Sequence, residues 1–292
     1  MKNKFRKIIS AYSFNLPLIL IAAIFILLPV IGTLITSFFR DVTFLPQKFL
    51  WLENYKYLIN DAHFWQSVRF TLLFVFFSVS IELFLGLIFA LTLNEVFPGR
   101  GILRIVILIP WAIPIAISAR IWQLIYNYDF GLLNFLVLKF GISPERISWL
   151  GSSVGAFISI VLSDVWKTTP FIAIILLSGL STISNELYEQ AMVDGSTMLQ
   201  RFFKVTLPLL KPVIIVALLF RTIDAVRIFD LIYVLTGGGP GGSTTSISLY
   251  AYNYLVSGDF GYGSAISVVL FLIAAILSIL YIKLGKFKEV IG

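Results

Sequence analysis

The sequence predicts an all-α polytopic membrane protein with six transmembrane helices. Hydrophobic residues make up 59% of the chain, charged residues only 13%, and the mean hydropathy is +0.96. These values lie far outside the range of soluble proteins. The apolar residues also gather in six long segments, each of which is long enough to cross a bilayer as a helix. We therefore expect an integral, multi-pass membrane protein.

The first apolar segment runs from Phe14 to Phe38 and follows a basic N-terminal stretch. Secretory signal peptides also begin with a basic stretch and an apolar run. This run is too long for the apolar part of a signal peptide, and it lacks a small-residue cleavage pattern. We therefore expect a retained helix whose N-terminus lies inside the cell.

The stretch from Arg40 to Arg69 is mixed polar and aromatic, and we expect an extracytoplasmic loop with short helical pieces. It contains His63, the only histidine of the chain. A lone imidazole cannot build a metal site, so we interpret His63 as a residue of the loop surface. Residues 1–69 then form an N-terminal region with one transmembrane helix, and residues 70–292 form a core with the other five.

Five further apolar segments are expected to span the membrane. They are Phe70–Leu93, Ile102–Ile125, Val154–Leu180, Leu209–Leu235 and Ser264–Leu284. With this topology, 12 of the 22 Lys and Arg residues lie inside, six outside and four within the membrane. Because positively charged segment ends stay in the cytoplasm, this bias places both termini there. The same distribution accounts for the net charge of +7 without a nucleic-acid partner.

A glycine-rich run, Gly237 to Gly242, follows the fifth segment. Such a run invites comparison with a phosphate-binding loop. It lacks the lysine of a P-loop, follows a membrane helix and faces outward in the expected topology. We therefore expect a flexible turn that forms a contact surface for an outside partner.

The longest polar interruption in the second half runs from Glu186 to Pro212. Ser184 is expected to cap a first helix, and Glu186 and Glu189 in its first turns complement the positive end of the helix dipole. Gly195 then breaks the pattern before a second short amphipathic helix. Two amphipathic helices joined by a glycine in the cytoplasm predict a docking surface.

Ionisable residues inside the apolar segments are the strongest physical indication of a pathway. A charge at the bilayer centre costs about 2.5 to 3.5 kcal/mol and needs a partner or water. Two clusters recur at helical spacing: Asp164, Lys167, Thr168 and Phe171 in the fourth segment, and Arg221, Asp224, Ala225 and Ile228 in the fifth. They are either structural ion pairs between helices, with Asp224 to Arg227 as a local pair, or the lining of a hydrated pocket. The spacing leaves both open.

No catalytic constellation is evident elsewhere in the sequence. The chain has no cysteine and one histidine, and its carboxylates are scattered over different segments. No nucleophile and base, and no metal cluster, therefore occur at a recognisable spacing. We expect a chain that catalyses no covalent step and takes the energy for uphill transport from partners.

Two motifs resemble those of one transporter family. Glu189-Gln190-Ala191, Asp194-Gly195 and Leu207-Pro208 resemble the cytoplasmic loop of permease subunits of binding-protein-dependent ABC importers, a loop that usually begins Glu-Ala-Ala. The block from Phe229 to Pro240, FDLIYVLTGGGP, is similar to the carbohydrate-uptake branch of that family, the maltose and trehalose type. The resemblance covers the chain from Phe14 to Lys286.

The resemblance implies a type I ABC importer permease fold in a cytoplasmic membrane and a heterodimer with a second homologous permease. It also implies two cytoplasmic ATP-binding subunits, which use ATP and Mg²⁺, and an extracytoplasmic sugar-binding protein. This chain itself would hold no cofactor and would otherwise contact membrane lipid. The loop of residues 184–208 would couple to the ATPase through Glu189, Ala191, Asp194, Gly195 and Pro208.

The resemblance also implies which residues hold the substrate. In the maltose permease of this family, residues on the spans before and after the conserved loop hold the sugar. Carried over, these positions fall on Asp164, Lys167, Thr168, Phe171, Arg221, Asp224, Ala225 and Ile228. We expect a disaccharide or oligosaccharide of the trehalose or maltose type, with a glycerol-phosphate or uronic-acid compound as the alternative. A secondary transporter would require an internal repeat with paired broken helices, which the two halves do not show.

Overall fold

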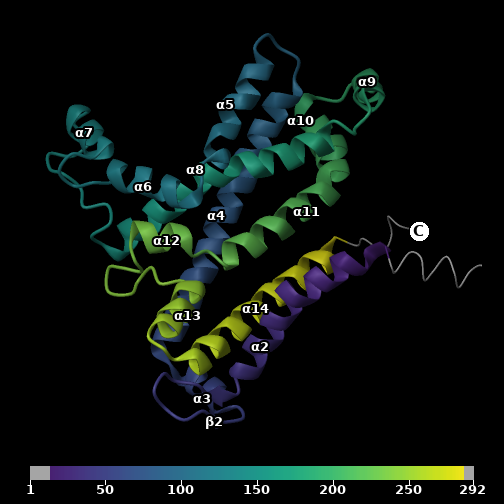
Figure 1. Ribbon diagram of the computed structural model, residues 1–292. Coiled ribbons are helices and arrows are strands. Elements are labelled where there is room, and N and C mark those ends of the chain that lie inside the picture. Colours follow the sequence, from purple (N-terminus) through teal and green to yellow (C-terminus); the bar gives the residue numbers. More distant parts are fainter. Residues whose placement is uncertain (1–13, 286–292) are drawn as a thin grey trace, which may run out of the picture. The chain divides into compact units, whose positions relative to one another are not determined.

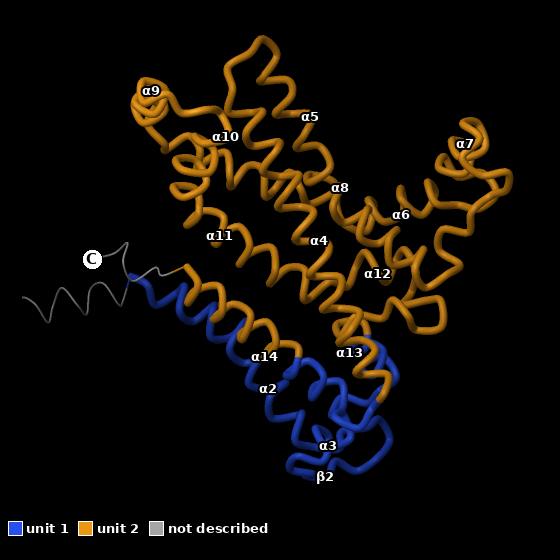
Figure 2. The backbone as a smooth tube through the Cα atoms, turned by 180° about the vertical axis from the view of Figure 1, so that it is seen from behind, with its two compact units in different colours: residues 1–61, 250–269 blue, residues 62–249, 270–292 orange. Residues whose placement is uncertain are grey.

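The computed structural model describes residues 14–285, which are helical apart from one short hairpin and the connecting segments (Figure 1). The chain forms two compact units (Figure 2). The first comprises residues 1–61 and 250–269, and the second comprises residues 62–249 and 270–292. The basic stretch at the N-terminus, together with Lys286 and Lys288 near the C-terminus, lies outside the described residues, and the expected cytoplasmic position of the two ends stays a prediction.

The expected membrane-spanning helices are present in the described part of the chain. Five helices are long and apolar enough to cross a membrane: Phe14–Thr36, Ala62–Asn94 (α4), Ser153–Leu180 (α8), Met198–Val226 and Phe260–Leu284 (α14). By length and composition, a bent pair, Arg100–Ala112 (α5) and Ile115–Ile125 (α6), makes a sixth when the two helices are counted as one span. The predicted all-α fold with six spans is therefore confirmed.

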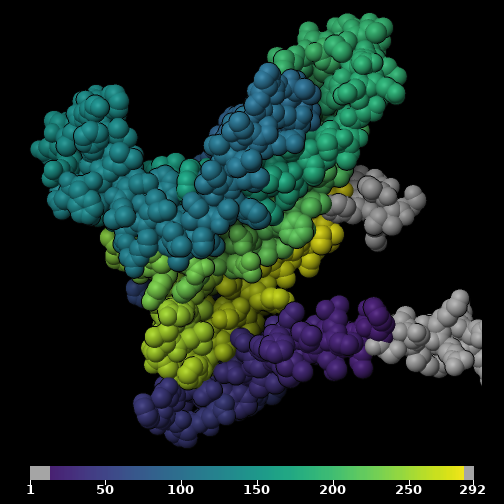
Figure 3. Space-filling view, turned by 45° about the horizontal axis from the view of Figure 1, so that its top comes forward, coloured from purple at the N-terminus to yellow at the C-terminus, as the bar shows by residue number. Residues whose placement is uncertain are grey.

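Shorter elements complete the fold or form parts of these spans. They are η1 (Ala23–Leu27), α2 (Leu28–Thr36), β1 (Phe39–Arg40), β2 (Lys48–Phe49), α3 (Glu53–Asn60), α7 (Leu132–Lys139), α9 (Asn185–Val193), α10 (Met198–Arg201), η2 (Phe202–Thr206), α11 (Leu207–Val226), α12 (Asp230–Leu235) and α13 (Ile247–Val256). The α9 region lies at one end of the second unit, where it forms a green projection in the space-filling view (Figure 3).

In the first unit, a small hairpin replaces part of the expected loop. Strands β1 and β2 pair antiparallel, and the Asn54 side-chain amide donates to the backbone oxygens of Ser37 and Phe39. Helix α3 is one of the expected short helical pieces, but residues 62–69 differ from the prediction, because α4 already begins at Ala62. His63 therefore lies in the first turn of α4 and not in a loop. Residues 62–69 are helical because Phe64, together with Ser67 and Val68, buries one helix face at its start.

In the second unit, α4 packs along α8, and α11 contacts both (Figure 1). Two glycines allow this close packing. A Cβ atom on Gly86 of α4 would lie 2.7 Å from Ile172 Cγ2 of α8, and one on Gly179 of α8 would lie 2.8 Å from Leu210 Cδ1 of α11. Small residues at helix interfaces let membrane helices approach in this way. The three helices thus form one tightly packed layer around a shared apolar cluster.

The third span is broken and does not form the single helix that the sequence predicts. Helices α5 and α6 meet at an angle of 93°. Pro114 caps α6, and Ile113 before it is extended. A residue that precedes proline is disfavoured in the helical region, so the chain turns at this dipeptide. The break places the first residue of α6, Ile115, beside the site described below.

The fifth span begins earlier than predicted, because α10, η2 and α11 join into one helix from Met198. The predicted segment began only at Leu209, directly after Pro208. Instead, the π-helical turn η2 precedes this proline, and the Leu207 amide bonds to the carbonyl of Phe202. A π-turn accommodates the missing N–H of the proline. The same device, η1, precedes Pro29 in the first span.

The fifth span also ends earlier than predicted. Helix α11 stops at Val226, with Arg227 as its C-cap, and α12 is a separate short helix that ends at Leu235. The glycine-rich run that follows is a turn, as expected, since Gly237 and Gly242 both have positive φ.

Candidate functional site

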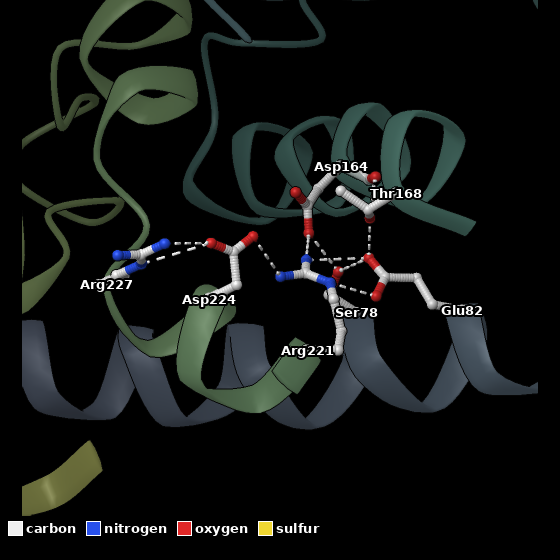
Figure 4. Close-up of polar contacts among 7 residues, drawn as sticks. All are labelled: Ser78, Glu82, Asp164, Thr168, Arg221, Asp224 and Arg227. Atoms are coloured by element: carbon white, nitrogen blue, oxygen red, sulfur yellow. Dashed lines mark hydrogen bonds and ion pairs between the residues drawn. The ribbon is translucent and has the colours of Figure 1, made fainter. Parts of the chain in front are cut away.

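Three membrane helices meet at Arg221 of α11, as Figure 4 shows. Its Nε donates to Oε2 of Glu82 on α4, with 2.5 Å between the two atoms, and its Nη2 donates to Oε1 of Glu82 at 3.0 Å. The same Nη2 donates to Asp164 of α8. Arg221 is 2% exposed and Glu82 is fully buried. A guanidinium gripped along one edge by a carboxylate is held in a fixed plane.

Two hydroxyl groups complete this buried network. Ser78 Oγ lies 2.9 Å from Glu82 Oε1 and 2.6 Å from Asp164 Oδ2. Thr168 Oγ1 lies 2.5 Å from Glu82 Oε1. A buried charge is costly unless its partners satisfy it, and here both carboxylates and two of the three guanidinium nitrogens, Nε and Nη2, have hydrogen-bond partners within the unit. The expected ion pairs between helices therefore exist.

Toward solvent, the network continues through longer contacts. Arg221 Nη1 lies 3.6 Å from Asp224 Oδ2, and Arg227 Nη2 lies 3.0 Å from Asp224 Oδ1. The predicted local pair of Asp224 and Arg227 is thus present. Their side chains are 52% and 70% exposed, in contrast to the buried part of the network. The chain of charges therefore leads from the inside of the helix layer to an accessible opening.

That opening is a cavity of about 380 Å³. It is lined by Ile115, Asp164, Lys167, Thr168, Arg221, Asp224, Arg227, Ile228, Phe229, Asp230 and Leu231. The structure thus brings together six of the eight residues that were expected to hold a substrate. The same side chains thus pair across helices and line a cavity, and the hydrated substrate pocket stays a prediction.

Lys167 lines the cavity, but its ammonium group is directed to the bend in the third span. Nζ lies 3.2 Å from the carbonyl oxygen of Trp111 and 3.4 Å from that of Pro110, and it also donates to the carbonyl of Ile113. These carbonyls belong to the end of α5, where helical partners are missing. Irregular backbone at membrane depth needs such a donor.

Phe171 and Ala225 are the two expected residues that do not line the cavity. The Phe171 ring stacks on Trp111, with 6.1 Å between the ring centroids, and packs against the apolar cluster of α4, α8 and α11. Ala225 is 1% exposed. The aromatic ring that does line the cavity is Phe229, which stacks on Tyr233 at 5.4 Å.

The sequence interpretation missed Glu82 and Ser78, which stand behind the cavity. One signal was available, because Glu82 is the only ionisable residue between Phe70 and Leu93. A lone carboxylate in an apolar span needs a partner on another helix. Its partner could not be identified from spacing within one segment.

A second exposed feature is the surface of α9. Ser184 caps this helix as predicted, since its Oγ accepts from the Glu186 amide at 3.2 Å. An open hollow of about 560 Å³ is lined by Glu186, Glu189, Gln190, Val193 and Asp194. Four large apolar side chains nearby are also exposed: Met192, Val193, Met198 and Leu199. Acidic and apolar groups thus lie together on an uncovered helix of this unit.

Helix α9 ends in a Schellman motif at Gly195. The Ser196 amide donates to the carbonyl of Ala191, and the Gly195 amide donates to that of Met192, both at 3.0 Å. Gly195 has φ of +75° with open space around the position of a Cβ atom. The glycine therefore serves a left-handed turn, and none of residues 14–285 other than its two chain neighbours comes within 4 Å of the position of its Cβ atom. Pro208 lies in the first turn of α11 and is exposed.

Comparison with known proteins gives consistent matches. Residues 82–286 match the family described as binding-protein-dependent transport system inner membrane component. The chain is 54% identical to the trehalose/maltose transport system permease protein MalF of Thermococcus litoralis, over 99% of this chain and 97% of that protein. It is 40% identical to the sulfoquinovosyl glycerol transport system permease protein SmoG of Agrobacterium fabrum, over 94% of this chain and 89% of that protein.

A solved structure has a similar fold. A chain of a bacterial alginate ABC transporter, crystallised in complex with an alginate pentasaccharide-bound periplasmic protein, superposes with a TM-score of 0.85. The alignment covers 99% of this chain and 98% of that one, at 22% identity.

Proposed function

Because the chain belongs to the family of inner membrane components of binding-protein-dependent transport systems, we propose that it is the permease subunit of an ATP-driven sugar importer. Its substrate in this proposal is a disaccharide or oligosaccharide of the trehalose or maltose type. The likeness to the trehalose/maltose permease supports this substrate class, since 54% identity extends over nearly the whole of both chains. The chain translocates the sugar and catalyses no covalent step.

The observation that carries the proposal is the composition of the 380 Å³ cavity. Its wall presents guanidinium and carboxylate groups side by side, at Arg221, Asp224 and Arg227. A sugar hydroxyl both donates and accepts, so it suits a wall in which donors and acceptors alternate. Phe229 adds an apolar ring against which a sugar face packs.

The charge balance favours a neutral solute over a glycerol-phosphate or uronic-acid compound. The cavity is lined by three cationic side chains, Lys167, Arg221 and Arg227, and by three carboxylates, Asp164, Asp224 and Asp230. Glu82 behind the wall adds a fourth carboxylate. Arg221 and Arg227 are both paired with carboxylates, and the Lys167 ammonium bonds to backbone carbonyls. An anionic solute would therefore find no unpaired cation in the wall.

The proposed partners are a second homologous permease, two cytoplasmic ATP-binding subunits and an extracytoplasmic sugar-binding protein. The α9 surface supports the ATP-binding partner, because Glu189 and the exposed apolar side chains offer an acidic and apolar docking site at one end of the unit. In this proposal the ATP-binding subunits use ATP and Mg²⁺. When the two ATP-binding subunits close on ATP, they move α9. The cavity then alternates between being open to the outside and being open to the cytoplasm.

The test is a reconstitution of this chain with its partner subunits in proteoliposomes. ATP hydrolysis and uptake are measured with the sugar-binding protein and with trehalose, maltose, glycerol 3-phosphate or glucuronate. We expect trehalose or maltose to stimulate hydrolysis and to accumulate inside, while the two anions do neither. Stimulation and uptake by an anion, with no response to either disaccharide, would contradict the proposal.

A further inference from the structure

We propose that Glu82, which does not line the cavity, is the positioning residue that aims Arg221 at the sugar. The inference rests on the proposed function, since it assumes that the cavity binds a sugar. Glu82 lies on α4, one helix behind the residues that form the wall (Figure 4). It is fully buried and contacts two wall residues, Arg221 and Thr168.

The geometry of the guanidinium group defines what Glu82 does. Glu82 takes the edge formed by Nε and Nη2, with distances of 2.5 and 3.0 Å to its two carboxylate oxygens. Asp164 takes Nη2 from the other side. A guanidinium is planar, so fixing these two nitrogens also fixes the third. Nη1 is the remaining nitrogen, and Figure 4 shows it directed toward Asp224.

Nη1 is a hydrogen-bond donor and the Asp224 carboxylate is an acceptor, but the two do not bond to each other. Their 3.6 Å distance is too long for a hydrogen bond, although it is short enough for an ion pair. Asp224 is 52% exposed and lines the cavity together with Arg221. A sugar with neighbouring hydroxyls can accept from Nη1 and donate to Asp224 without breaking the Glu82 grip. The hydrogen bonds of Nε and Nη2 thus hold the guanidinium in place, and Nη1 is the nitrogen that contacts the sugar.

Sugar discrimination shows whether Glu82 positions Arg221 or only stabilises the fold. If Nη1 is held in place, removing the hydroxyl that it contacts costs about tenfold in transport rate, as expected for one hydrogen bond to a charged group. If the guanidinium is loosened, this penalty shrinks. A purely structural role lowers the transport of every sugar by the same factor.

The experiment uses the reconstituted importer with trehalose and its monodeoxy analogues, or with maltose and its analogues if maltose is the better substrate. The ratio of parent to analogue uptake is measured for the native complex, Glu82→Gln and Glu82→Asp. Because the same binding protein is present throughout, its own discrimination cancels when the ratios are compared. Glu95→Gln is the matched control, because Glu95 is an exposed carboxylate just after the end of the same helix.

We expect at least one analogue whose tenfold penalty falls to about twofold in both Glu82 variants and stays at tenfold in Glu95→Gln. An unchanged ratio in the Glu82 variants, with uptake of all sugars lowered equally, would overturn the inference. Glu82→Asp keeps the buried charge paired while drawing one oxygen away from the guanidinium. If Glu82→Gln does not assemble with its partner subunits, Glu82→Asp alone decides the question by the same ratio. A native complex that transports neither disaccharide would refute the proposed function before any variant is tested.

Discussion

The side-chain ammonium of Lys167 donates to the carbonyl oxygen of Trp111, with 3.2 Å between the two atoms. Lys167 lies on α8, and Trp111 lies at the end of α5, immediately before the 93° bend of the third span. A helix end at membrane depth leaves carbonyls that water cannot reach. The lysine therefore fixes the broken span to the central helix layer, although the sequence places it among the substrate residues.

This relationship predicts that Lys167→Met lowers the stability of the complex. The loss of a charged donor to buried carbonyls should cost about 1 to 3 kcal/mol. The measurement is the midpoint of thermal unfolding of the purified complex. Lys139→Met is the matched control, since Lys139 is an exposed residue at the end of α7 and its Nζ lies 5.6 Å from the Phe135 ring centre. An unchanged midpoint together with abolished sugar transport would assign Lys167 to the sugar instead.

The clusters on α8 and α11 could be predicted from sequence because both follow from spacing within one helix. Asp164 and Lys167 share a face by the helical repeat, and so do Arg221 and Asp224. The structure confirms that these four residues line one cavity. The partners across helices could not be predicted in the same way. Glu82 is 139 residues from Arg221 in sequence, and nothing in its own segment indicates which helix it faces.

The fold shows the same limit. Length and hydropathy predicted the existence of the spans, because a bilayer demands long apolar helices. They did not predict where the fifth span begins, because the proline at position 208 normally marks a helix start. The π-turn η2 lets the helix continue through this proline. Its presence depends on backbone hydrogen bonds that cannot be predicted from the residue types. The early start of α4 was missed because Ala62 to Arg69 is too polar to be recognised as membrane helix.

A second prediction concerns Gly195 at the end of α9. A residue with a side chain in the left-handed region costs about 1 to 2 kcal/mol, so Gly195→Ala should distort the Schellman turn and the α9 surface. We expect sugar-stimulated ATP hydrolysis to fall several-fold while the amount of inserted protein is unchanged. Gly195→Asp should be more severe, because it also adds a charge beside Asp194.

The control for this prediction is Gly141→Ala. Gly141 has φ of +64°, and it also has open space around the position of a Cβ atom, but it follows α7. The Gly141→Ala substitution introduces the same kind of backbone strain at a site that is not part of α9. Equal losses of activity in both variants would show that strain alone is responsible and that α9 has no special part in coupling.

A third prediction is that the purified chain alone hydrolyses no ATP. The glycine-rich run at Gly237 to Gly242 lacks a lysine, and it folds back on itself. Thr244 Oγ1 donates to the carbonyl of Gly239 at 2.6 Å, and the Thr244 amide donates to that of Gly238 at 3.1 Å. A phosphate-binding loop instead directs its amides at the ligand. Phosphate release is measured for the chain alone and for the whole complex, and hydrolysis by the chain at the rate of the complex would refute the assignment.

The last prediction separates two aromatic residues, one of which the sequence selected for the sugar. Phe171 was among the residues expected to hold the sugar, but it stacks on Trp111 and packs among the helices, and it does not line the cavity. Phe229 lines the cavity, and its ring stacks on Tyr233 at 5.4 Å between centroids, with only 16° between the ring planes. A ring supported from behind by another ring offers a rigid flat surface to a sugar.

Leucine at either position keeps most of the apolar volume but removes the flat face. Phe229→Leu should therefore lower sugar transport by about tenfold, a loss of the size expected when an aromatic contact worth 0.5 to 1.5 kcal/mol is removed together with part of the buried ring area. Phe171→Leu is its matched control and should change transport by less than about twofold, because a swap of similar volume in a core costs little. Uptake is measured at sugar concentrations below saturation, where a loss of binding energy lowers the rate, and assembly is followed by copurification of the partner subunits. If Phe171→Leu lowers transport more than Phe229→Leu in a fully assembled complex, the prediction is wrong and Phe171 of α8 is the ring that contacts the sugar.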